Sequence, residues 1–227
     1  VHRCAYLLRV QRVPAKSIII LCFNRQAAGE LRRRLWDLVE TNSVGVTILT
    51  YHGLAMCLIG ASFAERLESA GEEGRIDFDG LIEQAVRLLR GEEDFAGLGR
   101  DEIRDRLLAG YQHILVDEYQ DINQLQYDLV SALAGRSLEA EEAEAKLTLM
   151  AVGDDDQNIY TFRGANVSYI RQFEEDYKAK FHYLVENFRS TANIIAAGNC
   201  LIARNRDRMK TEYPIRINKG REGHEPG

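Results

Sequence analysis

The stretch Ile-Leu-Val-Asp-Glu-Tyr-Gln-Asp at residues 114–121 decides the fold class, because a short apolar run ends there in two adjacent acids. Continuous apolar runs are typical of parallel strands that are buried on both faces. Ligands of open α/β sheets bind beyond the carboxyl ends of such strands, where Asp117 and Glu118 would lie. One carboxylate there can hold Mg²⁺ on nucleotide phosphates while its neighbour orients or deprotonates the attacking water. The stretch therefore predicts a metal-binding and water-activating acid pair; the alternative is a solvated strand end.

The composition is that of an ordinary globular protein. The 227 residues are 45% hydrophobic and 28% charged, with a formal net charge of −6. This charge argues against a basic coat over the whole surface, although four arginines within 25–34 allow a local groove for nucleic acid. The four widely spaced cysteines fit no metal-ligand pattern and indicate a reducing, cytoplasmic setting. The longest apolar run, 18–23, is far too short to cross a membrane, so we expect no membrane partner.

Strand-like and helix-like patterns alternate along the chain, which predicts a largely parallel sheet flanked by helices. The expected strands are 18–23, 46–49, 114–116, 147–152 and 181–185. The expected helices lie within 1–9, 27–39, 78–89 and 122–133. Gly135 is suited to the left-handed position that ends the last of these helices. Residues 59–110 are acidic and punctuated by glycine, and we interpret them as a small inserted helical subdomain.

Five segments occur in an order that is typical of one protein family. They are LCFNRQAAGELRRRL at 21–35, LTYHGLA at 49–55, ILVDEYQDINQLQ at 114–126, VGDDDQNIYTFRGA at 152–165 and ENFRS at 186–190. In these segments the chain resembles the UvrD/Rep-like superfamily 1 ATP-dependent DNA helicases. The resemblance implies a RecA-like P-loop NTPase fold with ATP and Mg²⁺ as cofactors.

The resemblance also implies a division into domains. The first RecA-like domain would comprise 1–58 and 111–180 and would be incomplete at its N-terminus. Residues 59–110 would be the helical insertion. Residues 181–227 would form the junction and the start of a second RecA-like domain.

Residues that match the family's nucleotide site carry roles implied by the resemblance. Asp117 would coordinate Mg²⁺, and Glu118 would act as the base that positions water. Gln157 would sense the γ-phosphate, because its amide can donate to phosphate and accept from water; the alternative is an ordinary turn residue. Arg189 would stabilise the γ-phosphate as an arginine finger does, the alternative being a surface arginine. Phe188 replaces the family's usual tyrosine, so it would stack on adenine without the hydroxyl's hydrogen bond.

Other matching positions imply single-stranded DNA and duplex junctions as partners. The matching residues are Phe23, Thr50, His52, Tyr160, Phe162 and Arg163. Bases of any sequence stack on aromatic side chains in a positive groove. Each ring taken alone is more often a core residue. However, Tyr160 and Phe162 flank Thr161 beyond a strand end, which favours a surface platform.

Two parts of the family pattern have no counterpart in this sequence. The phosphate-binding string GxxxxGK[ST], which supplies backbone amides and a lysine to phosphates, does not occur in the 227 residues. The family's later motifs do not follow Asn218 either. We therefore expect a fragment that starts just after the phosphate loop and is inactive alone. The parent is expected to be a helicase that moves on single-stranded DNA, separates duplexes in repair or recombination, and lies in the cytoplasm with the nucleoid.

Two other functions stay open at this point. A helicase-derived module that lacks the phosphate loop would bind DNA or protein without catalysis, and the residues before Val1 would distinguish it. A metal-dependent nuclease would use Asp117, Glu118 and 154–156, although only the carboxylates support it. Under the resemblance, 154–156 shape a loop and join a polar network instead of binding metal.

Overall fold

The computed structural model describes residues 1–59, 78–92, 110–135 and 147–217. Its centre is a four-stranded parallel sheet with the strand order β2-β1-β3-β4. The strands are β1 (Ile18–Cys22), β2 (Thr47–Thr50), β3 (His113–Val116) and β4 (Thr148–Ala151). The sequence predicted all four strands to within one residue at each end, and the predicted α/β class is confirmed.

The register of the sheet brings the ends of all four strands to one edge. Cys22 of β1 pairs with Thr50 of β2, and Leu21 pairs with Val116 of β3. Val116 pairs in turn with Ala151 of β4. The segments that follow these strands therefore leave from the same edge of the sheet, which is where ligands of open α/β sheets bind.

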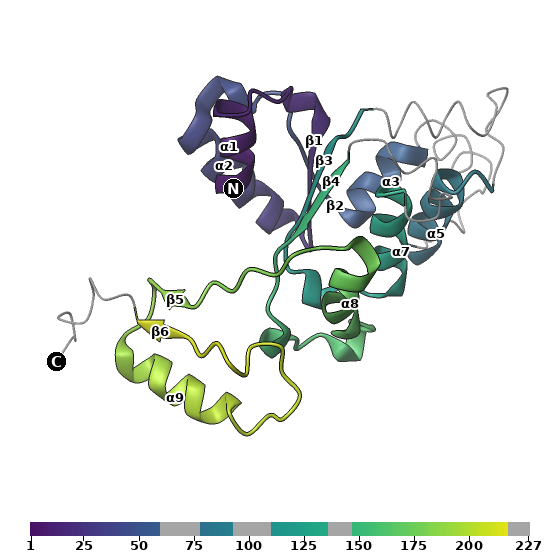
Figure 1. The fold of residues 1–227 in the computed structure, drawn as a ribbon. Helices are drawn as coiled ribbons and strands as arrows, with labels where there is room; N and C mark the ends of the chain where they lie inside the picture. The colour runs from purple at the N-terminus through teal and green to yellow at the C-terminus, as the bar shows by residue number, and fades with distance from the viewer. Residues whose placement is uncertain (60–77, 93–109, 136–146, 218–227) are drawn as a thin grey trace, which may run out of the picture.

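Helices cover both faces of the sheet, as Figure 1 shows. On one face lie α1 (His2–Arg9) and α2 (Arg25–Val39), and on the other lie α3 (Tyr51–Ile59), α5 (Phe78–Leu89), α7 (Gln124–Leu133) and α8 (Ser168–Tyr177). Alternate residues of β1 pack into two separate cores: Ile18 and Ile20 with α1 and α2, and Ile19 and Leu21 with the opposite helices. Burial on both faces explains the unbroken apolar run. Within the described ranges, no helix is long and apolar enough to cross a membrane.

Local sequence signals fix the ends of two helices that begin near the edge of the sheet where the four strands end; we call this edge the functional edge. The Asn24 side chain accepts a hydrogen bond of 2.8 Å from the Ala27 N–H and so caps α2. Asn123 and Gln126 form a reciprocal capping box at the start of α7. Gly135, just after α7, has φ 74°, the left-handed conformation that its sequence position predicted.

The predicted insertion contributes one described helix to the main core. The α5 residues Leu81, Ile82 and Leu89 are buried in the same cluster as Ile19 of β1. Residues 60–77 and 93–109 of the predicted insertion lie outside the described residues. The division into domains stays a prediction.

A smaller C-terminal part lies beyond the functional edge of the sheet (Figure 1). It contains β5 (Glu186–Asn187), α9 (Ala192–Ile202) and β6 (Arg216–Ile217), and β5 and β6 pair in parallel. No residue of α9 is buried, although the helix is largely apolar: the exposed fractions of Ile194 and Leu201 are 62% and 72%.

The predicted strand at 181–185 is wrong. The described chain pairs only Glu186 and Asn187 in this region, and the preceding run lies on the surface with Leu184 85% exposed. Its alternating aromatic residues pack on each other and on a later loop: the ring centroids of Tyr183 and Tyr213 are 4.3 Å apart. An apolar run forms a buried strand only where other strands and helices flank it. Here the aromatic rings pack against one another instead.

Candidate functional site

Asp117 and Glu118 follow β3 without interruption. The Asp117 N–H donates to the Leu21 carbonyl over 2.9 Å, so the ladder between β3 and β1 extends to this acid. Asp117 is half-buried, and burial, then the neighbouring Glu118 carboxylate, raise its pKa. Glu118 is exposed and has φ 52° and ψ 50°, a left-handed conformation that is uncommon outside glycine. One acid is thus anchored to the sheet while the other is presented to solvent.

The chemistry of this acid pair fits a divalent cation. Burial and the repulsion between adjacent carboxylates both disfavour two negative charges at this place. A bound cation would relieve that repulsion, and carboxylate oxygens are the ligands that Mg²⁺ prefers. Asp117 therefore suits the metal-binding role predicted for it, and the role itself stays a prediction.

Gln120 is a site residue that the sequence reasoning missed. Its side chain is buried, and its Nε2 donates to Glu118 Oε2 over 2.9 Å and to Asp121 Oδ2 over 3.2 Å. Its Oε1 accepts from the Asp154 N–H over 3.0 Å. The signal available in the sequence was a lone amide set between the apolar Tyr119 and Ile122, both of which are buried.

The polar segment that follows β4 contains the short 3-10 helix Asp155–Gln157. The Asp154 side chain caps it by accepting from the Asp156 N–H over 3.1 Å. Gln157, the predicted γ-phosphate sensor, is exposed and donates through Nε2 to Asp154 Oδ2 over 2.8 Å. This hydrogen bond fits a turn role, and the sensor role stays a prediction.

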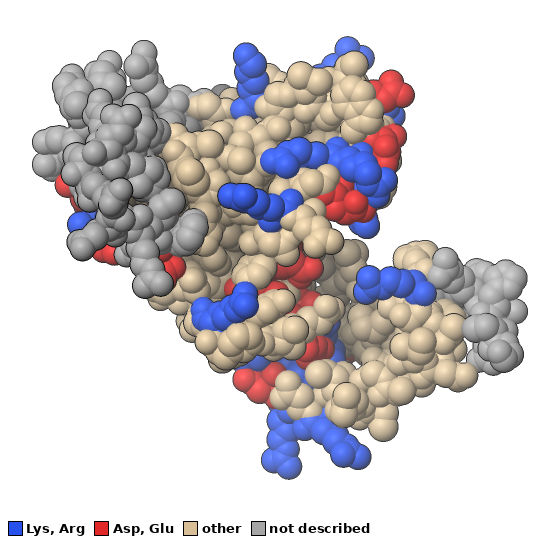
Figure 2. Space-filling model, turned by 180° about the vertical axis from the view of Figure 1, so that it is seen from behind, with Lys and Arg blue, Asp and Glu red and all other residues tan. Residues whose placement is uncertain are grey.

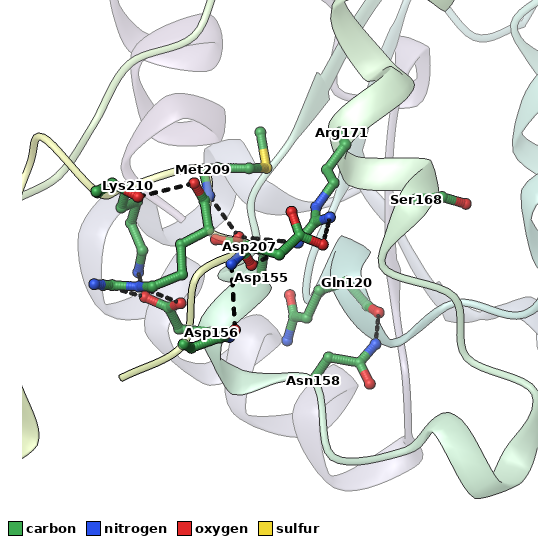
Figure 3. A network of polar contacts seen from close by, with 12 residues as sticks. Gln120, Asp155, Asp156, Asn158, Ser168, Arg171, Asp207, Met209 and Lys210 are labelled. Atoms are coloured by element: carbon green, nitrogen blue, oxygen red, sulfur yellow. Dashed lines mark hydrogen bonds and ion pairs between the residues drawn. The ribbon is translucent and has the colours of Figure 1, made fainter. Parts of the chain in front are cut away.

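The three aspartates of this loop are bound by cations and an amide of the C-terminal part. Figure 3 shows Asp155 and Asp156 next to Met209 and Lys210. The carboxylate oxygens of the three aspartates lie within 4.8 Å of one another, which would be close enough to hold a metal ion. However, Asp156 forms a two-point ion pair with Arg208, with distances of 2.8 and 2.7 Å. Asp154 pairs with Lys210, and Asp155 accepts from the Met209 N–H over 2.8 Å. We call residues 154–156 and 208–210 the aspartate latch; its pairing leaves the nuclease hypothesis without a metal site here.

The aspartate latch is expected to open in acid. Burial alone would raise the pKa of Asp156, but the hydrogen bonds and charges of Arg208 and Lys210 outweigh it and lower the pKa. A lowered pKa in the folded protein gives stabilisation that is complete above the unfolded value, about 3.9, and is lost as the pH falls through the lower folded value.

Hydrogen exchange of residues 205–213, corrected for the intrinsic effect of pH, should therefore stay slow between pH 7 and 5 and accelerate only below about pH 4. An Asp156→Asn variant, which cannot ionise, should lose this part of the pH dependence. Acceleration that is already complete between pH 7 and 5 would contradict the assignment.

Three predicted stacking residues come together beyond the ends of β1 and β4. The rings of Phe23 and Tyr160 stack, with centroids 5.2 Å apart and planes 25° apart. The Tyr160 and Phe162 centroids are 6.1 Å apart. The Arg163 guanidinium lies 5.7 and 5.6 Å from the Tyr160 and Phe162 ring centroids. We call these four residues the aromatic cluster; Phe162 is 78% exposed, so a ring face is available to a flat ligand.

Thr50 and His52 lie at the neighbouring end of β2. Thr50 pairs in register with Cys22, the residue before Phe23, and its Oγ1 accepts from the Gly53 N–H over 3.1 Å. The hydroxyl therefore supports the first turn of α3, which is a structural role. His52 is half-buried, and burial lowers its pKa. DNA contacts by both residues stay predictions.

Arg189 and Phe188 lie in the C-terminal part, on the exposed turn after β5. The N–H of Arg189 donates to Asn187 Oδ1 over 2.9 Å, which shapes the turn. In the described parts of the chain, no hydrogen bond or ion pair joins Arg189 to the acid pair. Asn187 and Ser190 line a cavity of about 290 Å³ that also reaches Asp154 and Asp156 of the aspartate latch. The turn thus borders the junction of the two parts, while the roles of Arg189 and Phe188 toward ATP stay predictions.

Charge is distributed unevenly on the face seen in Figure 2. Lysine and arginine side chains spread over the sheet-containing part, and acidic side chains lie both beside them and near the hollow between this part and the C-terminal part. Three of the four arginines of α2 are engaged: Arg33 and Arg34 pair with Glu30 at 2.8 and 2.6 Å, and the Arg32 guanidinium donates to the Ile48 carbonyl. The predicted local groove therefore depends on fewer free cations than the sequence count indicates.

A parallel sheet with helices on both faces, an acid pair after a central strand and polar loops at the neighbouring strand ends define a RecA-like α/β domain. The chain belongs to the UvrD/REP helicase family, because residues 1–69 and 60–178 match the UvrD/REP helicase N-terminal domain. The family predicted from the five sequence segments is confirmed.

Named relatives agree with this assignment. The chain is 29% identical to DNA helicase II of Haemophilus influenzae over 278 residues, and the match covers 92% of this chain and 37% of that protein. DNA helicase II of Escherichia coli is also 29% identical, with the same coverage. ATP-dependent DNA helicase UvrD1 of Mycobacterium tuberculosis is 40% identical over 157 residues, which cover 69% of this chain and 19% of that protein. The chain thus spans about 37% of the length of the two helicase II relatives.

Proposed function

We propose that the protein containing this chain is an ATP-dependent DNA helicase that moves on single-stranded DNA and separates duplexes. The chain would supply most of the ATPase domain and the first surface for DNA. DNA repair or recombination is the proposed setting, and single-stranded DNA and duplex junctions are the proposed substrates. The names of the related helicases support this proposal. We propose a cytoplasmic location with the nucleoid on the same grounds.

The observation that carries the proposal is the juxtaposition of two chemistries at one sheet edge. The acid pair follows β3, and the aromatic cluster joins the segments that follow β1 and β4. β1 and β4 are the two neighbours of β3 in the sheet. A structural change at the acid pair could therefore be transmitted over a short distance to the aromatic cluster, the surface proposed for DNA.

The acid pair would divide the hydrolysis chemistry between its members. Mg²⁺, when bound with ATP, would neutralise charge on the phosphate oxygens. Asp117, anchored to the sheet, would hold this ion. Glu118, exposed beside it, would orient the attacking water and accept its proton. Gln157 and Arg189 would contact the γ-phosphate, and Phe188 would stack on adenine.

The aromatic cluster would hold DNA without reading its sequence. Phe162 offers an exposed ring to a base, while Arg163 adds a positive charge beside the same rings. Stacking of this kind tolerates every base because each has a π face. Thr50 and His52 would contact the backbone next to the cluster.

The test of this function is ATP turnover by the full-length protein with and without single-stranded DNA. Turnover should rise with DNA, and Phe162→Ala should raise the DNA concentration for half-maximal stimulation by about 5- to 100-fold, the effect of losing one base stack. Trp36→Ala is the control, since Trp36 is also an exposed aromatic residue but lies toward the far end of α2 from Phe23. DNA binding without any turnover would favour the non-catalytic module instead, and equal effects of the two substitutions would contradict the stacking role.

A further inference from the structure

The buried amide of Gln120 connects the proposed base with the loop that carries the aromatic cluster. We infer that Gln120 is a positioning residue, which holds the Glu118 carboxylate in its working orientation and joins it to residues 153–161. The inference rests on the proposed function, because Glu118 must act on water for its orientation to matter. It concerns a residue that touches the base, not the reacting atoms.

The hydrogen bonds of Gln120 use every polar atom of its side chain. A buried amide is unfavourable unless its donors and acceptor are satisfied. One N–H is directed at Glu118 Oε2, the other at Asp121 Oδ2, and Oε1 accepts from the Asp154 N–H. With the side chain only 1% exposed, the amide has no freedom to exchange these partners for water. The Glu118 carboxylate is therefore held at one oxygen, and its other oxygen is left for a water molecule.

The exposed position of Glu118 makes this restraint necessary. A glutamate side chain has three rotatable bonds, and an exposed carboxylate samples many orientations. Proton abstraction requires the carboxylate within about 2.6–3.2 Å of the water, either directly or through a second water. Glutamine is a neutral donor, so it orients the carboxylate without the charge that a lysine would bring to the same place.

Gly153 shows that the amide is held tightly from the opposite side. A Cβ atom at position 153 would lie 2.6 Å from Gln120 Oε1 and 2.8 Å from Ile170 Cδ1. Both distances are below those that real Cβ atoms make, so only glycine fits here without displacing the amide. The close approach is what allows the next residue, Asp154, to donate its N–H to Gln120.

The same amide residue is connected to the proposed DNA surface through two further hydrogen bonds. The Asn158 Nδ2 donates to the Gln120 backbone carbonyl over 2.6 Å, a contact drawn in Figure 3. Asn158 Oδ1 accepts from Thr161 Oγ1 over 2.9 Å. Thr161 lies between Tyr160 and Phe162, two members of the aromatic cluster. If DNA displaces these rings, the displacement would therefore change the orientation of Glu118 through Thr161, Asn158 and Gln120.

The test uses the full-length protein and a Gln120→Met variant, which keeps the length of the side chain but removes its hydrogen bonds. We expect the DNA-stimulated kcat to fall by about 10- to 100-fold, the usual consequence of a small misplacement of a catalytic group. The KM for ATP and the DNA concentration for half-maximal stimulation should change less than about threefold, because neither ligand touches Gln120. Gln124→Met, an exposed glutamine on α7, is the matched control and should keep full turnover.

Two further measurements separate positioning from general damage to the fold. Combined with Glu118→Gln, the Gln120→Met change should lower single-turnover hydrolysis no further, since a residue that acts through Glu118 has nothing left to orient. Gly153→Ala, which pushes the same amide from the other side, should reproduce the loss of kcat.

The outcomes distinguish this inference from the proposed function. Wild-type protein without DNA-stimulated turnover would overturn the proposed function. Stimulated wild-type protein together with a Gln120→Met variant of unchanged kcat, or with additive losses in the double variant, would overturn the positioning role alone.

Discussion

Replacing Glu118 with glutamine is expected to lower ATP turnover of the full-length protein by 10²- to 10⁴-fold, the usual contribution of a general base. The amide keeps the size of the side chain and can still meet the amide of Gln120 through its oxygen. It cannot accept a proton from water at neutral pH. The effect should therefore fall on kcat, while the binding of ATP and of single-stranded DNA stays within a few-fold of wild type.

Single-turnover hydrolysis and separate measurements of ATP and DNA binding check this expectation. Glu40→Gln is the matched control, because Glu40 is also exposed and also has a positive φ, 49°, but lies at the far end of α2. It should retain full turnover. If the Glu118→Gln protein hydrolyses ATP within about threefold of wild type, Glu118 is not the base.

The second large effect is expected at the aspartate latch. The side chains of Asp156 and Arg208 are only 11% and 10% exposed, and their ion pair is bidentate. Removing one partner of a buried pair costs about 3–5 kcal/mol because the other charge is left uncompensated; this pair is only partly buried, so we expect about 3 kcal/mol. Asp156→Ala should therefore release residues 205–213 from the sheet-containing part, and hydrogen exchange there should accelerate by about two orders of magnitude or more.

Asp207→Ala provides the comparison for that experiment. Asp207 also bridges the two parts, through an ion pair of 2.5 Å with Arg171, but its side chain is 82% exposed. Exposed pairs contribute about 0–1 kcal/mol, so this change should accelerate exchange by about fivefold at most. Similar exchange rates in the two variants would mean that the aspartate latch does not hold the C-terminal part in place.

The sequence predicted those features that depend on neighbours along the chain. The four strands of the main sheet follow from unbroken apolar runs, and Gly135 from its place after a helical pattern. The acid pair was predictable from its place after a strand, and the aromatic cluster was predicted from the family resemblance. Parallel strands deliver their following residues to one edge, whatever the packing details. Residues that are far apart in the sequence, such as Phe23 and Tyr160, met there for that reason.

What the sequence did not predict depends on partners from distant segments. The run 181–185 has the composition of a strand, but whether a strand forms depends on a flanking partner, and Tyr183 instead packs on Tyr213. Arg208 and Lys210 are ordinary surface cations by pattern, and only the fold brings them to Asp156 and Asp154. Gln120 is polar, and nothing in its spacing reveals that the 153–158 loop closes over it.

The left-handed backbone conformation of Glu118 brings protein stability and the carboxylate at this position into conflict. A residue with a Cβ atom in this conformation is strained by about 1–2 kcal/mol, and glycine or asparagine would adopt it more readily. The most stabilising exchanges at position 118 are therefore ones that remove the carboxylate. With Glu118 as the proposed base, a search for heat-resistant variants that selects on stability alone should favour substitutions at this residue and return proteins with little ATP turnover.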